Sequence, residues 1–528
     1  MVIYMFSSES ILGYDEEFFE KEKAEPRFFT DLNLDQIVNR IMGMRKDYDL
    51  RRYFYRLPKS VDAAKHRVEV LKALKQENVL NGFLDFSDKM RQSRFYWGKF
   101  GIAKTTIQKQ RYLLDCGYEY VQAVEKLKAA LDANECGSVL LTSFGSELDR
   151  YVDGEWFQEF SKKTKALARS FADMRVQIRI EGEKLHISME ESKDNGRYAD
   201  RLKSVFPENE SIKETVENPF IEEEDIGELE LLILDMLQKN KEEVFVELHR
   251  YYENYKTPES ILQQGLLVFE RQLQVYIAFY QFFEKQGVKY PMSFPEFLET
   301  DGRASCKMEV CSGYDLALYL KRYTPEYQIV CNDIKYNEDE KFMVVTGPNQ
   351  GGKTTFARSI GQIIYFSLMG FMAPCSSVKL PFFNGILTHF SVEESMETGR
   401  GKLKEELVRL EPMMKSDDRG CFVVINELFT TAATGDAYVM GKNVMEHFMD
   451  RDFMGIYVTH IQELADEGQI GGEKNHIVSL MACVDEQNPR LRTYQIKRRK
   501  AEGIGYAYGL VEKYRLTYPE MVKRLKEV

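Results

Sequence analysis

One short segment constrains the fold more than any other, because it joins an apolar run to a glycine-rich loop. Residues 341–346 read KFMVVT, which is typical of a buried strand, and the loop GPNQGGKT follows at 347–354. Residues Thr355 to Met369 then have the pattern of a helix. This is the motif GxxxxGK[ST] in the strand–loop–helix order that it requires. It predicts an α/β domain with a parallel, buried sheet.

The loop carries the groups that bind phosphate. Its glycines let backbone N–H groups surround the phosphate oxygens, and the helix amino end adds its dipole. Lys353 is expected to neutralise the β and γ oxygens, and the Thr354 hydroxyl to ligate Mg²⁺. We therefore predict ATP and Mg²⁺ as the bound groups. The predicted nucleotide-binding residues are Gly347, Pro348, Asn349, Gln350, Gly351, Gly352, Lys353, Thr354 and Thr355.

A second predicted strand, Cys421 to Ile425, ends in Asn426 and Glu427. Phosphate-loop ATPases place acidic residues after such a strand, so Glu427 is predicted to act as the general base that orients the attacking water. Asn426 stands where an aspartate normally holds a Mg²⁺-bound water. A carboxamide keeps the hydrogen bond through its carbonyl but loses the attraction between charges. We predict weaker Mg²⁺ binding or slower turnover. Taken alone, an Asn-Glu pair at a strand end is more often a turn.

A third predicted strand begins at Gly455 and ends in Thr459 and His460. His460 could reach the γ-phosphate or the attacking water. A lone histidine is more often structural, so this assignment depends on its neighbours in the fold.

The pattern of the remaining sequence predicts mostly helices. From Asp31 to about Gly154, apolar residues recur at three-to-four spacing, with a break at Pro58 to Ser60. Alternating residues at 176–180 and 185–189, separated by Glu-Gly-Glu, predict a β-hairpin between helices. The segment from Pro258 to Phe283 is apolar over so much of its length that it predicts a largely buried helix.

Composition limits the partners and the compartment. The 72 basic and 84 acidic residues leave a net charge of −12, so any contact with DNA must be local. Eight scattered cysteines without CxxC spacing predict reduced thiols. No targeting segment or long uncharged apolar stretch is visible, so we expect a soluble, cytoplasmic protein without a membrane partner.

Taken together, these motifs resemble the MutS family of ABC-type ATPases. The resemblance is carried by TGPNQGGKTTFARSIGQ, GFMAPCSSVKLPFFNGILTHF, ETGRGKLKEEL, VVINELFTTAATGDA, YVTHIQELAD and GYAYGLVEKYRLTYPEMVKRL, in the family's order. The resemblance implies a multidomain fold. An all-α core and lever domain with a small clamp-like β-hairpin insertion precedes an α/β P-loop ATPase domain of the ABC type. The domains implied are an amino-terminal segment at 1–30, a core and lever domain at 31–324 with the insertion near 170–220, and an ATPase domain at 325–528 with carboxy-terminal dimerisation helices.

The resemblance also implies roles for individual residues. Glu427 would be the catalytic carboxylate, His460 the switch histidine and Asp436 the acidic residue after the second strand. A signature loop would complete the ATP site of the opposite subunit, which makes a homodimer part of the mechanism; it consists of Thr398, Gly399, Arg400 and Gly401. Three departures point to a slow or conditional ATPase. Asn426 replaces an aspartate, Gly401 replaces a serine, and Ile329 replaces the aromatic residue expected against the adenine.

Binding to DNA is implied mainly by the resemblance. Phe18-Phe19-Glu20 and Phe297-Leu298-Glu299 fit the family's Phe-x-Glu mismatch wedge, but neither lies in a separate amino-terminal domain, so we expect no recognition of mismatches by a wedge. Basic residues around the predicted hairpin could contact phosphates or form an ordinary solvated face. They are Lys162, Lys163, Lys165, Arg169, Arg175 and Arg179.

Two classes of function stay open. The first is an ATP-gated homodimeric clamp that binds double-stranded or branched DNA in repair or recombination. The second is an ATP-dependent switch whose partner is a protein, which the net charge of −12 favours. A metabolic kinase is a distant third, because it would leave the signature and histidine motifs unexplained.

Overall fold

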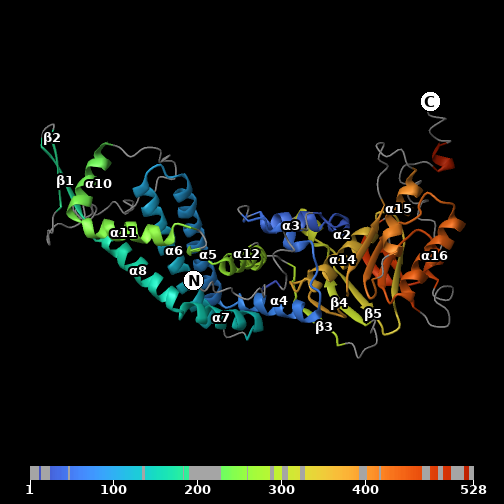
Figure 1. Ribbon diagram of the computed structural model, residues 1–528. Coiled ribbons are helices and arrows are strands. Elements are labelled where there is room, and N and C mark those ends of the chain that lie inside the picture. The colour runs from blue at the N-terminus through green and yellow to red at the C-terminus, as the bar shows by residue number, and fades with distance from the viewer. Residues whose placement is uncertain are drawn as a thin grey trace. The chain divides into compact units, whose positions relative to one another are not determined.

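We analysed a computed structural model of the chain (Figure 1). The structure describes residues 11–12, 24–43, 45, 48–133, 137–181, 184–189, 228–257, 260–285, 290–299, 307–321, 328–391, 401–415, 418–466, 476–485, 491–500 and 517–521. Two compact units are present. Unit 1 contains residues 81–132 and 145–267, and unit 2 contains residues 5–80, 133–144 and 268–528. The chain is thus a multidomain protein of mixed helices and sheets. The predicted domain boundaries stay predictions.

Unit 1 is built from helices and one hairpin. The helices are α5 (Glu77–Ile102), α6 (Thr106–Asp132), α7 (Val139–Val152), α8 (Glu155–Ala172), α10 (Glu228–Asn240) and α11 (Glu242–Tyr255). Helix α6 packs against α8 and α11. The approach to α11 is close because Gly117 has no side chain: a Cβ there would lie 2.2 Å from the Tyr251 hydroxyl oxygen. The predicted hairpin is present as antiparallel strands β1 (Val176–Glu181) and β2 (Lys184–Met189).

The helices α2 (Arg27–Asp31), α3 (Leu34–Met42), η1 (Arg51–Phe54), α4 (Val61–Ala73) and α12 (Gln264–Lys285) precede the sheets of unit 2. The break predicted at Pro58 to Ser60 is confirmed, since α4 begins directly after it and the Ser60 hydroxyl caps the helix by accepting a hydrogen bond from the Ala63 N–H at 3.2 Å. Helix α12 begins at Gln264 rather than at Pro258. Residues 260–263 instead form a short turn, in which the Ser260 N–H donates to the Thr257 carbonyl.

The main sheet of unit 2 has the strand order β12-β11-β6-β10-β9-β8. Its strands are β6 (Phe342–Thr346), β8 (Ile386–Phe390), β9 (Phe422–Asn426), β10 (Met454–Val458), β11 (Ile477–Val484) and β12 (Arg492–Arg498). All neighbours are parallel except β11 and β12. This confirms the three strands predicted around residues 341–346, 421–425 and 455–460. A second sheet has the order β3-β7-β4-β5, with β3 (Pro295–Phe297), β4 (Met308–Gly313), β5 (Asn332–Tyr336) and β7 (Ser377–Leu380).

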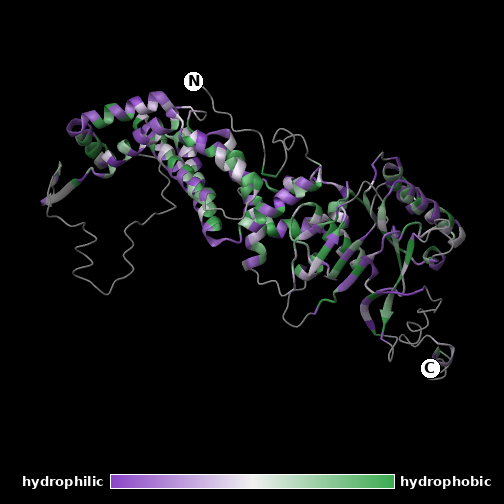
Figure 2. Ribbon diagram, turned by 90° about the horizontal axis from the view of Figure 1, so that it is seen from below, coloured by the Kyte–Doolittle hydropathy of each residue, from purple (hydrophilic) through white to green (hydrophobic). Residues whose placement is uncertain are grey.

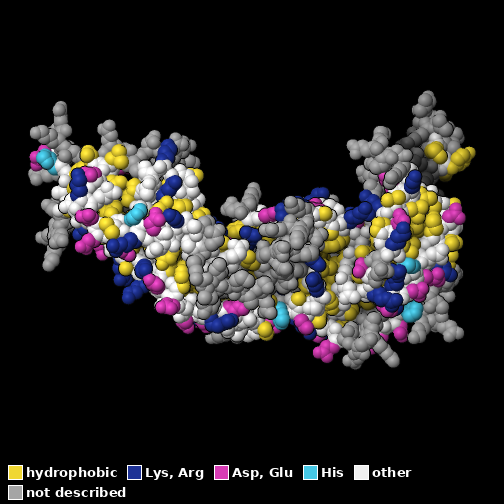
Figure 3. Space-filling model, in the orientation of Figure 1, with side chains coloured by type: hydrophobic (Ala, Val, Ile, Leu, Met, Phe, Trp, Pro, Cys, Tyr) yellow, Lys and Arg dark blue, Asp and Glu magenta, His cyan; other side chains and the backbone are white. Residues whose placement is uncertain are grey.

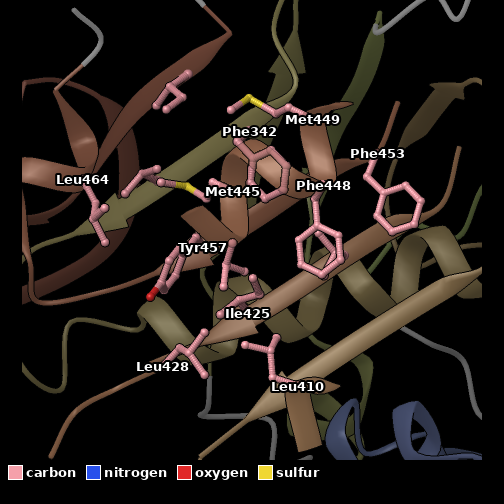
Figure 4. Packing of buried hydrophobic residues seen from close by; sticks show 14 of the residues in the cluster. Phe342, Leu410, Ile425, Leu428, Met445, Phe448, Met449, Phe453, Tyr457 and Leu464 are labelled. Carbon is pink, nitrogen blue, oxygen red and sulfur yellow. The ribbon is translucent and has the colours of Figure 1, made fainter. Parts of the chain in front are cut away.

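Helices cover both faces of the main sheet. Strands β6, β9 and β10 are buried at every residue, as expected for parallel strands between two helical layers. Phe342, Ile425 and Tyr457 point to the face covered by α15 (Lys402–Lys415) and α16 (Thr434–Asp450), as Figure 4 shows. Helix α14 (Lys353–Leu368) contacts β9 and β10. The strands and their covering helices form the hydrophobic centre of the unit (Figure 2).

The amino-terminal helices of unit 2 pack beside the helix that follows the phosphate loop. The Arg358 side chain donates to the Asp31 carbonyl at 3.0 Å, and the Gln362 amide donates to the Leu32 carbonyl at 2.9 Å. Helix α13 (Leu316–Lys321) contacts both α3 and α14. Among the described helices, none is both long and apolar enough to cross a membrane.

Candidate functional site

The candidate site lies where three parallel strands end side by side. Val458 of β10 pairs with Val345 of β6 on one side and with Asn426 of β9 on the other. The loops that leave these strands therefore begin at the same edge of the sheet, which is where open α/β sheets bind ligands. The three motifs, separated in the sequence, converge here.

The phosphate loop links β6 to α14 in a conformation that needs glycine at both ends. Gly347 has φ of 120° and Gly352 has φ of 89°, which side chains with a Cβ rarely adopt. At Gly347, a Cβ would also lie 3.0 Å from the side chain of Ala482 in β11. Helix α14 begins directly at Lys353, so its amino end faces the loop.

Lys353 is folded back over the loop. Its ammonium donates to the Gly347 carbonyl at 3.0 Å and to the Pro348 carbonyl at 3.1 Å, and the residue is 5% exposed. Burial lowers the pKa of Lys353, while the nearby Glu427 carboxylate opposes that shift. An anion bound by the loop would replace the carbonyl partners of the ammonium and restore its preference for the charged form.

The two predicted Mg²⁺ ligands are neighbours. The Thr354 hydroxyl donates to the Asn426 Oδ1 atom at 3.0 Å, which joins the start of α14 to the end of β9. Both atoms are hard oxygen donors of the kind that Mg²⁺ prefers. The pair therefore fits a Mg²⁺ ion held by the threonine directly and by the asparagine through water, with one negative charge fewer than an aspartate would supply.

Glu427 and His460 form a hydrogen-bonded pair beside these residues. The His460 Nε2 atom lies 2.8 Å from Glu427 Oε1. This hydrogen bond lowers the pKa of Glu427 against the opposing effect of burial, and Lys353 adds a weaker attraction. The carboxylate is therefore ionised at neutral pH. Glu427 adopts a left-handed conformation with φ of 56°, and its N–H donates to the Val458 carbonyl at 2.9 Å.

A buried carboxylate, that of Glu406, accepts a hydrogen bond from the turn that follows Glu427. Glu406 on α15 is 1% exposed, and its Oε2 atom accepts a hydrogen bond from the Phe429 N–H at 3.0 Å. Phe429 also has a left-handed φ, 62°. The hydrogen bond thus holds the turn that follows Glu427 and ties it to the helix that follows the predicted signature loop. Sequence reasoning missed Glu406, because nothing in its helix pattern marks a buried acid.

An aromatic residue that the sequence analysis missed lies against the phosphate loop. A Cβ built on Gly352 would be 3.3 Å from Tyr494 Cδ1, and Tyr494 is 50% exposed. The Tyr494 carbonyl accepts a hydrogen bond from the Asn332 amide at 3.2 Å. This hydrogen bond joins the start of β5, three residues after Ile329, to β12, which carries Tyr494. The only available signal was the position of Tyr494 in an alternating stretch.

Of the other predicted site residues, Ile329, Gly401 and Asp436 lie in the described part of the structure. Ile329 is half-buried, and its N–H donates to the Tyr290 hydroxyl at 2.8 Å. Gly401 and Asp436 are exposed, at the starts of α15 and α16 respectively. Thr398, Gly399 and Arg400 lie outside the described residues.

The basic residues near the hairpin are partly committed to acidic neighbours. Lys163 forms an ion pair with Glu159 at 2.6 Å, and Lys165 pairs with Glu125. Lys162, Arg169 and Arg175 are exposed, and Arg179 lies opposite His186 in the hairpin. The pairing reduces the positive charge that this surface offers to a polyanion.

Comparison with known proteins identifies relatives of the chain. Residues 343–527 match the family MutS domain V. The chain is 31% identical over 137 residues to the DNA mismatch repair protein msh-2 of Neurospora crassa, covering 26% of this chain and 15% of the relative. It is 21% identical over 389 residues to the DNA mismatch repair protein MutS of Streptococcus uberis, covering 70% and 43%. The DNA mismatch repair protein MutS of Aquifex pyrophilus is 24% identical over 232 residues, covering 42% and 26%. Each match spans less than half of the relative's length.

Proposed function

We infer that this chain is an ATP-dependent DNA-binding protein. The inference rests on its membership of the MutS family, which the match of residues 343–527 to domain V supports. We propose that it hydrolyses ATP with Mg²⁺ and works as a homodimeric, ATP-gated clamp on double-stranded or branched DNA in repair or recombination. The observation that carries the proposal is the convergence of the phosphate loop, the Thr354–Asn426 pair and the Glu427–His460 pair at one sheet edge.

Each of these residues has a role in the proposed hydrolysis. The phosphate loop binds the phosphates through its backbone N–H groups, and Lys353 exchanges its carbonyl partners for phosphate oxygens. Mg²⁺, when bound, supplies positive charge to the phosphate oxygens. Ionised Glu427 orients the attacking water and accepts its proton. His460 holds the carboxylate by its hydrogen bond and fixes the direction of the second oxygen.

The dimer rests on the resemblance of residues 398–401 to the signature loop. Gly401 begins α15, since its carbonyl accepts the Lys404 and Glu405 N–H groups. The same helix carries Glu406, which holds the turn after Glu427. A nucleotide that contacts the signature loop of one subunit could thus affect the catalytic turn of that same subunit. This supports a gate in which ATP favours the closed dimer and hydrolysis releases it.

Two substitutions test the site. Replacing Lys353 by Ala should abolish nucleotide binding, because no other described side chain of the loop carries positive charge. Replacing Glu427 by Gln should keep binding and reduce hydrolysis at least about 100-fold, as expected for loss of a general base. Nucleotide binding by fluorescent analogue and steady-state hydrolysis measure both effects. Lys415→Ala is the matched control, since Lys415 is exposed on α15 and pairs only with Glu411 among the contacts described. Full turnover by either site variant would refute the assignment.

Asn426 tests the proposal of slow turnover. An aspartate at this position would keep the acceptor for the Thr354 hydroxyl and add one negative charge beside the predicted metal. Asn426→Asp should therefore lower the Mg²⁺ concentration needed for half-maximal hydrolysis. The measurement is the Mg²⁺ titration of the hydrolysis rate, with Asn426→Ala as the variant that loses the acceptor. An unchanged Mg²⁺ requirement in Asn426→Asp would contradict the role of the missing charge.

Two observations favour the alternative function, an ATP-dependent switch that acts on a protein. The net charge is −12, and two of the basic residues near the hairpin pair with acidic side chains. Binding of labelled duplex and four-way junction DNA at two salt concentrations, with ADP or a non-hydrolysable ATP analogue, separates the two functions. DNA affinity that changes with nucleotide supports the clamp. Nucleotide-dependent dimerisation without DNA binding supports the protein switch.

A further inference from the structure

The helix that follows the phosphate loop carries three polar residues on one side. Thr354, Arg358 and Gln362 are spaced four residues apart in α14, so their side chains lie on the same side of the helix. Thr354 donates to Asn426 at the end of β9. Arg358 and Gln362 donate instead to backbone carbonyls of residues 31 and 32, at the end of α2. The same side of α14 therefore meets the main sheet at its first turn and α2 at the next two.

Asp31 connects this side of α14 back to the main sheet. Its carbonyl accepts the Arg358 Nε–H at 3.0 Å, and its carboxylate accepts the hydroxyl of Thr388 in β8 at 2.7 Å. Thr388 lies two residues before Phe390, which pairs with Asn426 of β9. Helix α14 is thus attached to the strands β8 and β9 at two points about one helical turn apart, directly at the first turn and through Asp31 at the second.

The corner of the chain at residues 31–33, which we call the α2 corner, fits into a hole on α14. A Cβ on Gly361 would lie 2.4 Å from the Leu32 Cδ2 atom, so only glycine leaves room for this leucine. Leu32 is fully buried, and Asn33 follows it with a left-handed φ of 57°. Shape and hydrogen bonds therefore fix the α2 corner at one place along α14.

Positive charge surrounds the Asp31 carboxylate, which is half-buried. Burial raises the pKa of Asp31, and its hydrogen bond and three cations oppose that shift. The cations are Arg409, Arg358 and Arg27. The Arg358 guanidinium also lies 5.1 Å from the centre of the Phe390 ring, at the end of β8. Figure 3 shows Lys and Arg side chains on the surface of unit 2 around α2 and α15. Attraction between charges thus adds to the hydrogen bonds that hold the carboxylate between α14 and β8.

We propose that Asp31 is a positioning residue for the Mg²⁺ end of the nucleotide site. It sets where α14 lies over β8 and β9, and this placement determines how far the Thr354 hydroxyl lies from Asn426. Mg²⁺ demands near-ideal geometry with oxygen ligands at about 2.0–2.1 Å, so a small shift of α14 weakens the metal site. The backbone N–H groups of the phosphate loop move with the helix and keep their contacts with phosphate. The inference rests on the proposed function and deepens it, because it assigns control of the Mg²⁺ site to the amino-terminal helices.

The test compares nucleotide affinity with and without the metal. A fluorescent ATP analogue is titrated into the full chain in Mg²⁺ and in EDTA, and the ratio of the two dissociation constants gives the Mg²⁺ effect. Thr388→Val removes the hydroxyl and keeps the shape of the side chain. It should reduce the Mg²⁺ effect about 2- to 10-fold, the range for loss of one hydrogen bond, and leave the affinity in EDTA within about 2-fold. Thr388→Ser keeps the hydroxyl and should retain the full effect.

Asp31 is tested by its own substitution and by the double variant. Asp31→Ala should reduce the Mg²⁺ effect at least as much as Thr388→Val does. Because both substitutions break the same hydrogen bond, the double variant should lose little more than Asp31→Ala alone.

A compensating pair tests the α2 corner by shape. Gly361→Ala places a methyl group where Leu32 lies and should push the corner away from α14, which reduces the Mg²⁺ effect. Adding Leu32→Ala makes room for that methyl group and should restore most of the effect. Leu113→Ala is the matched control, because Leu113 is an equally buried leucine of α6 in unit 1. It should lower the thermal unfolding temperature and leave the Mg²⁺ effect unchanged. Circular dichroism verifies that each variant folds.

The outcomes separate this inference from the proposed function. A Mg²⁺ effect that falls in Thr388→Val and is kept in Thr388→Ser supports the inference, whether or not the chain hydrolyses ATP quickly. A Mg²⁺ effect unchanged in Thr388→Val and in Gly361→Ala overturns it and leaves the proposed function standing. Equal losses of affinity in Mg²⁺ and in EDTA overturn it too, because the contact would then serve stability alone. Absence of nucleotide binding by the unmodified chain refutes the proposed function and this inference with it.

Discussion

At the scale of single residues, Tyr494 is an exposed aromatic side chain next to the phosphate loop. Its ring lies beside Gly352, and its strand is hydrogen-bonded to the segment that carries Ile329. Ile329 offers apolar packing in place of an aromatic ring. An exposed ring next to the loop can supply the stacking that Ile329 cannot. We therefore expect Tyr494 to contact the base or the ribose of the bound nucleotide.

The test is the substitution of Tyr494 by Ala. Loss of one aromatic contact is worth about 0.5–1.5 kcal/mol, so the dissociation constant for ATP should rise about 2- to 10-fold with little change in the maximal rate. Tyr494→Phe keeps the ring and should behave like the unmodified protein. Binding of a fluorescent ATP analogue gives the constant. Equal affinity in the Ala variant would mean that the ring lies outside the nucleotide site.

At the scale of secondary-structure elements, α15 and the loop after β9 are joined by the buried Glu406. One oxygen of its carboxylate accepts the Phe429 N–H, and burial raises the pKa of the carboxyl group. In β8, burial lowers the pKa of His389 to about 4, so its imidazole is neutral at neutral pH, and its Nε2 atom lies 3.3 Å from the Glu406 carbonyl. These contacts make α15, β8 and the catalytic turn one packed assembly.

Removing the carboxylate should therefore affect catalysis through the turn. Glu406→Ala leaves a buried N–H without its acceptor, which costs about 1–3 kcal/mol, and should let the Glu427 turn move. We expect the maximal hydrolysis rate to fall about 10-fold or more while ATP affinity stays within about 2-fold. Glu406→Gln keeps an acceptor and should restore most of the rate. If both variants lost stability but not rate, the contact would be structural only.

At the scale of the whole molecule, the proposed homodimer is the feature with the largest consequence. A γ-phosphate that bridges two subunits stabilises only the closed dimer, so blocking hydrolysis should preserve that state. Glu427→Gln should sediment as a dimer in ATP and shift toward monomer in ADP. Adding Lys353→Ala to the same chain should abolish the ATP effect. A mass that is the same in ATP, in ADP and without nucleotide would contradict gating by ATP.

The local pattern of the sequence was sufficient to predict the three central strands of the site, the phosphate loop and the helix that follows the loop. The strand Phe342–Thr346 is buried on both faces, so all its residues but the last are apolar. The glycines at 347 and 352 stand where the phosphate loop has φ of 120° and 89°, which residues with a Cβ rarely adopt. The hairpin at 176–189 was predicted for a similar reason, because its residues alternate. These features depend on neighbours along the chain, and the sequence contains those neighbours in order.

Contacts between distant segments could be decided only by the tertiary structure. The ring of Tyr494 meets Gly352 because β11 and β12 pair beside β6. Glu406 meets Phe429 because α15 packs against β8, the neighbour of β9 in the sheet. The ion pair of Lys165 with Glu125 removed charge from a surface that looked basic in the sequence. Hydrogen bonds and ion pairs act over a few ångströms in space, whereas periodicity reports only which face of an element is apolar. The sequence alone therefore determined the chemistry available to this protein, and the fold decided which groups act together.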